Sequence, residues 1–138
     1  MIDLSTEFGQ RVQRRLTEER IIWLTTLSEG SRPQPRPVWF LWDGEIFLIF
    51  SRPNTFKLQH IVKNPQVALN FDGDRLGGDI VVFVGDAQIC QDDPSADRVA
   101  SYVEKYREGM QHLQMTPEEF GKVYSVLIRV KPKKLRGY

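Results

Sequence analysis

The feature that most constrains the fold is a pair of apolar, aromatic stretches separated by Asp43-Gly44. Residues 36–42 and 45–50 are rich in Val, Ile, Leu, Phe and Trp, residue types that are mostly favoured in strands. Glycine readily adopts the positive φ of a tight turn, and Asp-Gly is among the strongest short-range hairpin signals. The two stretches therefore predict an antiparallel β-hairpin with prolines only at its entry.

Four further stretches have the composition of strands: residues 21–27, 67–71, 80–89 and 124–130. Segments rich in Gly, Pro, Asn and Asp separate several of them, as expected of turns. With the hairpin they give about six antiparallel strands, which can close or partly close into a barrel. The strand at 80–84 is apolar on both faces, so we expect a second copy of the chain to cover one face.

Helices are expected to flank these strands, which makes the class mainly β (α+β). Ser5 and Thr6 precede an amphipathic helix, and Asn54 is expected to cap a second helix from residue 55 to about 63. Residues 92–94 open a third helix, for which Gly109 is a plausible end signal. A fourth begins at Thr116, with proline and acidic residues in its first turn. The basic residues 131–138 are interpreted as a solvated terminus, with polyanion binding as the alternative.

Composition limits the class of protein. The chain has 138 residues, 41% of them apolar, which fits one domain spanning 1–138. Its 19 basic and 18 acidic residues leave a near-neutral charge, so we expect neither a nucleic-acid partner nor a membrane partner. The single cysteine, and the lack of any signal-like or membrane-length apolar run, predict a cytoplasmic protein.

The sequence contains no motif typical of a self-sufficient enzyme. His60 and His112 are not spaced as metal ligands, and neither a phosphate-binding loop nor a nucleophile motif is present. We therefore assign no catalytic or metal-binding residue and expect a bound cofactor to carry any difficult chemistry.

Residues 51–57 are the first candidate binding segment, because they join a predicted strand to a predicted helix. Ser51 and Thr55 offer hydroxyls, Arg52 and Lys57 offer charges, and the helix start offers free N–H groups, a set suited to phosphate. The alternative is an ordinary capped helix with surface cations.

Residues 37–42 are the second candidate, with Trp39, Phe40 and Trp42 distributed over both faces of one strand. One face could contact a flat ring system. The alternative is that these rings fill the barrel and a dimer interface.

The order of these segments resembles the pyridoxamine 5′-phosphate oxidase-like FMN-binding split barrels. The resemblance runs from Trp23 to Ile89 and rests on these pieces: Arg36-Pro37-Val38-Trp39-Phe40, Phe50-Ser51, Thr55-x-Lys57, Lys63-Asn64-Pro65, Val67-Ala68-Leu69 and Val82-Phe83-Val84-Gly85. Four further pieces are similar to the branch that uses coenzyme F420: Ile22-Trp23-Leu24-Thr25-Thr26, residues 35–44, Gly77-Gly78-Asp79-Ile80-Val81-Val82 and Leu135-Arg136-Gly137-Tyr138.

The resemblance implies a split β-barrel that forms a homodimer, with two cofactors between the subunits. It implies that Ser51, Thr55 and Lys57 hold the cofactor phosphate, with Arg52 beside them. It further implies that the strand carrying Arg36, Pro37, Val38 and Trp39 lines the ring, and that Asp79 and Ile80 close the groove from the other subunit.

Two departures argue against vitamin B6 oxidation. Phe56 stands where those oxidases usually have an Arg, and Asp79-Ile80 stands where they carry a Gln. The resemblance therefore implies an F420-dependent oxidoreductase acting on a small molecule that the sequence does not identify. The alternatives are an FMN-binding reductase or oxidase, a non-catalytic flavin- or deazaflavin-binding protein, and a dimer without cofactor.

Overall fold

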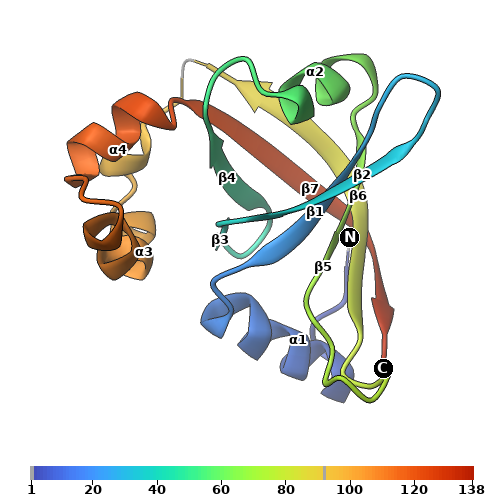
Figure 1. Ribbon diagram of the computed structural model, residues 1–138. Helices are drawn as coiled ribbons and strands as arrows, with labels where there is room; N and C mark the ends of the chain where they lie inside the picture. Colours follow the sequence, from blue (N-terminus) through green and yellow to red (C-terminus); the bar gives the residue numbers. More distant parts are fainter. Residues whose placement is uncertain (1, 92) are drawn as a thin grey trace.

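The structure is a computed structural model that describes residues 2–91 and 93–138. Antiparallel strands form one strongly curled sheet, in the order β2-β1-β5-β6-β7-β4-β3 (Figure 1). The strands are β1 Ile22–Leu27, β2 Pro33–Val38, β3 Leu41–Trp42, β4 Phe47–Ser51, β5 Gln66–Asn70, β6 Val81–Cys90 and β7 Val126–Gly137. The predicted fold class, a split β-barrel with flanking helices, is confirmed.

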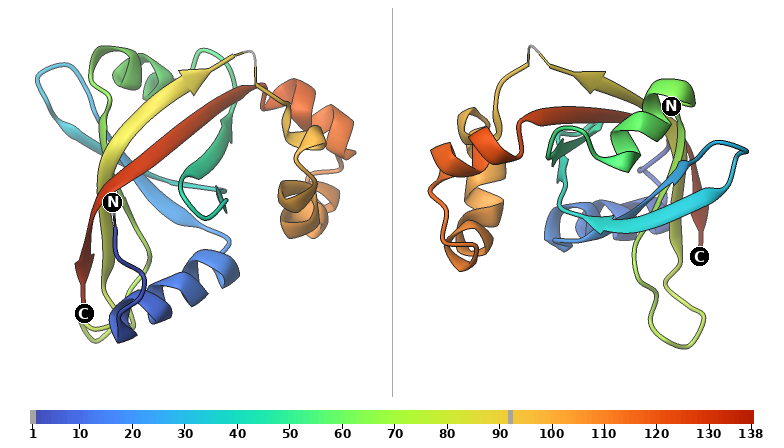
Figure 2. Two further views of the ribbon diagram at one scale, coloured as in Figure 1. Left: turned by 180° about the vertical axis from the view of Figure 1, so that it is seen from behind. Right: turned by 45° about the horizontal axis from the view of Figure 1, so that its top comes forward.

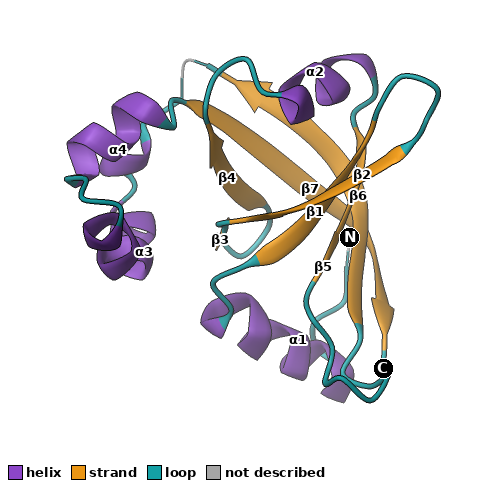
Figure 3. Cartoon of the chain, in the orientation of Figure 1, coloured by secondary structure: helices purple, strands orange, loops and turns teal. Residues whose placement is uncertain are grey.

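The helices lie at three places around the sheet. They are α1 Glu7–Glu18, α2 Phe56–Lys63, the short 3-10 turn η1 Ala96–Arg98, α3 Ala100–His112 and α4 Pro117–Val123. Figures 1 and 2 place α1 and α2 at opposite ends of the barrel, and α3 with α4 to one side of it. The secondary-structure colouring of Figure 3 shows that loops connect α3 and α4 to the sheet. In the described part of the chain, we find no helix with the length and apolar character that crossing a bilayer requires.

The strand predicted at residues 36–42 is divided in two, which is why the sheet has seven strands rather than six. Val38 pairs with Ile22 of β1, whereas Leu41 pairs with Leu48 of β4. The chain thus leaves one edge of the sheet and joins the other edge within two residues. Because β2 and β3 are the two edge strands, the short link between them closes the barrel covalently.

At this crossing the peptide groups of Phe40 cannot join a strand ladder, and α3 satisfies them instead. Phe40 is 0% exposed, and its N–H donates to the Tyr106 hydroxyl at 2.8 Å. Its carbonyl accepts from the Lys105 ammonium at 2.9 Å and lies 2.8 Å from the Tyr106 hydroxyl. Burial lowers the pKa of Lys105 to about 8.

Strand β2 begins earlier than predicted and contains three prolines, so the prediction of prolines only at its entry is wrong. Pro33, Pro35 and Pro37 lie opposite Leu27, Thr25 and Trp23 of β1. Alternate residues of a strand direct their N–H groups to opposite sides, and an edge strand needs donors on one side only. The prolines therefore occupy the positions whose nitrogens face away from β1.

The Asp43-Gly44 turn between β3 and β4 is confirmed. Gly44 has φ of 105°, a value that suits glycine. The Asp43 carboxylate accepts from the backbone N–H groups of Glu45 and Ile46, each at 2.9 Å. The side chain thus fixes the turn that aligns β3 with β4.

Two helix starts follow the prediction and one differs. Thr6 accepts from the Gly9 N–H at 2.9 Å at the start of α1. Thr116 and Glu119 form a reciprocal capping box at the start of α4. The predicted cap of α2 is wrong, because Thr55 holds the N-cap position and Asn54 has a left-handed φ of 62°, which asparagine tolerates better than most residues.

The third predicted helix differs at both ends. It begins at Ala100, after η1, instead of at residues 92–94, of which Asp92 lies outside the described residues. Gly109 does not end it, since α3 continues to His112. A Cβ atom at position 109 would lie 2.8 Å from the Trp39 ring, so glycine is explained there by close packing.

The core has two parts because β4 is buried on both faces. Phe47 and Ile49 belong to the cluster inside the barrel, which α1 and α2 close at the ends. Leu48 and Phe50 belong to a second cluster beneath α3 and α4.

The basic residues 131–136 are part of β7 and pair with β6, for example Lys134 with Val84 and Arg136 with Val82. The segment is therefore an ordered part of the sheet, and the side chains of Lys131, Lys133, Lys134 and Arg136 are exposed, as expected of a solvated terminus. The side chains of Val82 and Val84 are half-buried in the single chain, and their cover by a second copy stays a prediction.

We expect Tyr106→Phe to destabilise the protein, because it removes the hydroxyl that serves the Phe40 peptide groups. The expected loss is about 1–3 kcal/mol in the free energy of unfolding, the usual cost of stranding a buried polar group. Urea denaturation would measure it. Tyr138→Phe is the matched control, because Tyr138 is exposed and should change stability by less than about 0.5 kcal/mol. Equal stability of both variants would contradict this role.

Candidate functional site

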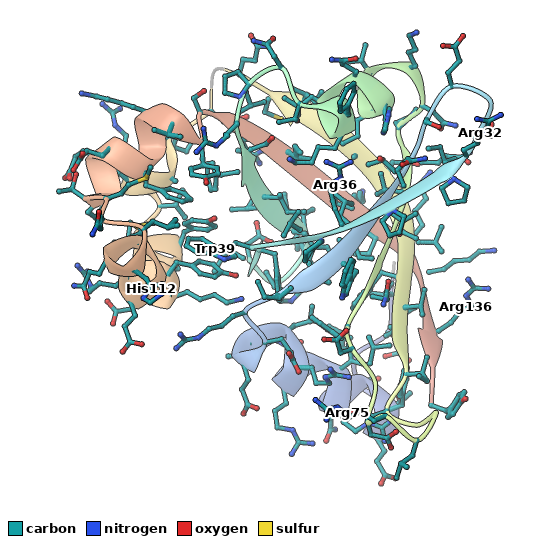
Figure 4. All side chains as sticks on the ribbon, viewed as in Figure 1. Arg32, Arg36, Trp39, Arg75, His112 and Arg136 are labelled. Atoms are coloured by element: carbon teal, nitrogen blue, oxygen red, sulfur yellow. The ribbon has the colours of Figure 1, made fainter. Side chains whose placement is uncertain are left out.

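A groove of about 350 Å³ lies between the barrel and the helical pair α3–α4. Its barrel side comes from the end of β2, the end of β4 and the junction of β4 with α2; its other side comes from α3, α4 and their flanking residues. Figure 4 shows Trp39 beside the helices and Arg36 below α2 in that view. The two candidate segments of the sequence therefore meet at one place.

The lining includes most of the predicted site residues: Pro37, Val38, Trp39, Ser51, Arg52, Thr55 and Lys57. Arg36 does not line the groove, but it lies close enough for its charge to act on Lys57. Asp79 and Ile80 do not line the groove of their own chain. Asp79 forms ion pairs with Arg11 and Arg15 of α1, and Ile80 exchanges backbone hydrogen bonds with Tyr138.

One end of the groove carries positive charge without a counter-charge. Burial lowers the pKa of Lys57, and the nearby charge of Arg36 lowers it further. The Arg36 Nε is buried and has no hydrogen-bond partner in the described part of the chain. Within residues 2–91 and 93–138, no carboxylate forms an ion pair with either cation. Such an arrangement is complementary to an anion.

Two hydroxyls lie beside this cationic end. Ser51 is 1% exposed, and its hydroxyl donates to the Arg52 carbonyl at 2.8 Å. The Thr55 hydroxyl lies 3.3 Å from that of Ser51 and makes no capping bond to α2. The left-handed turn at Asn54 is part of the loop between them. The Thr55 hydroxyl and the start of α2 fit the donors that a phosphate requires, and Ser51 would join them by turning its hydroxyl away from the Arg52 carbonyl.

The other end of the groove is aromatic. The Trp39 ring stacks on Tyr106, with centroids 4.5 Å apart, and on Phe120 at 5.4 Å. Phe120 in turn stacks on Tyr124 at 4.4 Å, and the Arg52 guanidinium lies 5.1 Å from the Tyr124 ring centre. Much of the indole surface is therefore committed to packing against the helices.

The aromatic residues of the second candidate segment separate by position. Trp39 faces the groove, whereas Phe40 belongs to the barrel core and Trp42 packs on Phe47 at 4.9 Å. The alternative that the rings fill the barrel is thus correct for Phe40 and Trp42.

The sequence analysis missed the groove residues contributed by the C-terminal helices. Tyr102 with Tyr106, and Phe120 with Tyr124, are spaced four residues apart, a spacing that places each pair on one helix face. That spacing was the available signal. It could not show that both faces turn toward the end of β4, because this depends on how α3 and α4 pack on the barrel.

The groove thus has a cationic end and an aromatic end. This arrangement suits a molecule with a flat, largely uncharged ring and an attached phosphate. Among the described residues that line the groove, no nucleophile is paired with a general base.

Comparison with known families finds a match over residues 8–138 to the family described as pyridoxamine 5′-phosphate oxidase. The comparison with curated proteins finds no match. Among solved structures, one described as an F420 reductase has a TM-score of 0.69 at 21% identity, covering 90% of this chain and 94% of its own.

Two other similar structures have different descriptions. The heme storage protein HutZ from Vibrio cholerae has a TM-score of 0.66 at 14% identity, covering 96% of this chain and 95% of its own. General Stress Protein 26 from Bacillus anthracis has a TM-score of 0.68 at 20% identity, covering 91% and 89%. At these identities the likeness concerns the fold.

We expect Gly109→Ala to destabilise the protein, although alanine is favoured over glycine in a helix by about 1 kcal/mol. The added methyl would meet the Trp39 ring, which the stacked rings of Tyr106 and Phe120 hold in place. We expect a net loss of about 1–3 kcal/mol, typical of overpacking, measured by urea denaturation with tryptophan fluorescence. Gln111→Ala, at an exposed position of the same helix, should be near neutral. A more stable Gly109→Ala protein would show that the ring moves freely.

Proposed function

Because the chain belongs to the pyridoxamine 5′-phosphate oxidase family, we propose that its groove binds a flavin-type coenzyme and that the protein is an F420-dependent oxidoreductase. The observation that carries the proposal is Lys57, which lines the groove with Ser51 and Thr55 and lies within range of the Arg36 charge. Neither cation forms an ion pair with a carboxylate of the described residues. A phosphate would supply the missing counter-charge, and the aromatic end would receive the ring.

Arg52 favours F420 over FMN. Its side chain is exposed at the wall of the groove and lies over Tyr124. FMN ends at its phosphate, whereas F420 continues into an acidic tail, and an exposed cation at the groove wall can pair with that tail. An FMN-dependent reductase or oxidase is the second candidate, since Arg36 and Lys57 suit either phosphate.

The described geometry does not favour heme binding, even though one similar structure is a heme storage protein. His60 lies on α2, with its Nδ1 2.8 Å from the Thr26 hydroxyl. His112 is exposed at the end of α3. Neither histidine lines the groove, where an iron ligand would be needed.

When bound, the coenzyme would donate a hydride to a small molecule or accept one from it. The chain's own part would be placement and exclusion of water. Lys57 would hold the phosphate, supported by the nearby charge of Arg36, while Phe50, Tyr102 and Phe120 would shield one side of the ring from water. We assign no acid or base.

A homodimer would add a second wall to the groove. We propose that the corner at Asp79 and Ile80 closes the groove of the partner, and α1 fixes that corner within its own chain. Arg15 donates to the carbonyls of Asp79 and Asp72, at 2.9 and 2.7 Å, and pairs with the Asp79 carboxylate. The dimer is part of the proposal and can be tested by light scattering at several concentrations.

Titration of the purified protein with F420, FMN and hemin would test the proposed coenzyme. We expect F420 to bind with the highest affinity, seen as a change in deazaflavin absorbance and fluorescence. Tighter binding of FMN would favour the second candidate. Binding of hemin alone, with a Soret band, would refute the proposal for both coenzymes.

We expect Lys57→Ala to weaken binding of the phosphate-bearing coenzyme by about 10- to 100-fold, corresponding to the loss of about 1.5–3 kcal/mol from a charged hydrogen bond. Fluorescence titration would measure it. Lys63→Ala is the matched control, because Lys63 is an exposed cation in the last turn of the same helix and outside the groove. If both variants bound coenzyme like the unchanged protein, the phosphate would not lie at Lys57.

A further inference from the structure

Tyr102 carries a hydroxyl that the fold leaves without a partner. The residue lies on α3 in the wall of the groove and is 0% exposed. Its hydroxyl oxygen is buried and forms no hydrogen bond with residues 2–91 or 93–138. Buried tyrosine hydroxyls usually find a partner, and stranding one is costly. Tyr106, one helical turn later, is the contrast, because its hydroxyl is fully used at Phe40 and Arg20.

Packing restricts the Tyr102 ring. It meets Phe50 edge-to-face with centroids 4.8 Å apart, and it lies 4.9 Å from the Tyr106 ring. Large rings on two sides limit how far the side chain can turn toward another acceptor. The unpaired hydroxyl is therefore a feature of the packed wall.

The hydroxyl belongs to the aromatic end of the groove. Burial raises the pKa of Tyr102 well above its ordinary value, and the neighbouring Tyr106 and Tyr124 raise it further. The group therefore stays protonated at neutral pH and can donate. The Tyr102 ring lies among the rings of that end, 4.9 Å from Tyr106 and 6.1 Å from Phe120.

We propose that Tyr102 binds the ring of the groove's ligand, donating a hydrogen bond to an acceptor at the ring edge, either a carbonyl oxygen or a ring nitrogen. This inference rests on the proposed function and deepens it. The ligand completes a hydrogen bond that the protein lacks by itself, so the groove selects planar heteroaromatic rings with an acceptor at that edge over plain hydrocarbons of the same shape.

Tyr102→Phe tests the inference, because it removes the hydroxyl alone. Without ligand, the variant should be as stable as the unchanged protein or more stable, with a Tm higher by about 2–5 °C, since an unpaired buried group is removed. Its affinity for the coenzyme should fall about 10-fold, because the ring acceptor is then buried without a donor.

A ligand without phosphate separates the two ends of the groove. We would titrate riboflavin beside FMN, or the phosphate-free deazaflavin beside F420. Tyr102→Phe should weaken both members of a pair by a similar factor. Lys57→Ala should weaken only the member that carries phosphate. Tyr106→Phe should lower the Tm, in contrast to Tyr102→Phe.

Several results would overturn the inference. A lower Tm for Tyr102→Phe would mean that the hydroxyl already has a partner, such as a buried water. Unchanged affinity would mean that the ligand does not reach it, and the proposed function would still stand. If Tyr102→Phe weakened binding only of the ligand that carries phosphate, the hydroxyl would contact the phosphate and not the ring. If the unchanged protein bound neither flavin nor deazaflavin, the proposed function and this inference would both fail.

Discussion

The closure of the sheet and the position of α3 both depend on the hydrogen bonds between α3 and the peptide groups of Phe40. A chain that passes from one edge of a sheet to the other must leave the ladder, and here it does so in a fully buried position. Tyr106 and Lys105 replace the missing strand partners. They also fix α3 against the barrel, so one set of contacts both closes the sheet and positions the helical wall of the groove.

The same crossing creates the two ends of the groove. Phe40 turns into the barrel core while Trp39, its neighbour, turns out against Tyr106 and Phe120. On the barrel side of the groove, β4 ends at Ser51, and the hydroxyls and cations near the start of α2 follow it in the chain. The double burial of β4 follows from this geometry, because a strand between a barrel and a helical pair needs apolar residues on both faces.

Local signals in the sequence were enough for most of the strands, the Asp43-Gly44 turn and the strand-to-helix junction at 51–57, since each depends on neighbouring residues. Features decided by packing could not be predicted in this way. The division of the 36–42 strand depends on hydrogen-bond partners more than 60 residues away. Gly109 was misinterpreted because its role is to make room for Trp39. The contribution of Tyr102 and Phe120 depends on where α3 and α4 pack.

The three prolines of β2 have a consequence for association between chains. Their nitrogens carry no hydrogen, so this border of the sheet presents carbonyl acceptors without the alternating donors that strand addition needs. The opposite border is the two-residue strand β3, too short to guide a long pairing. A second copy of the chain, if one binds, would therefore have to dock through side chains on the faces of the barrel, and the molecule resists growing into a continuous sheet.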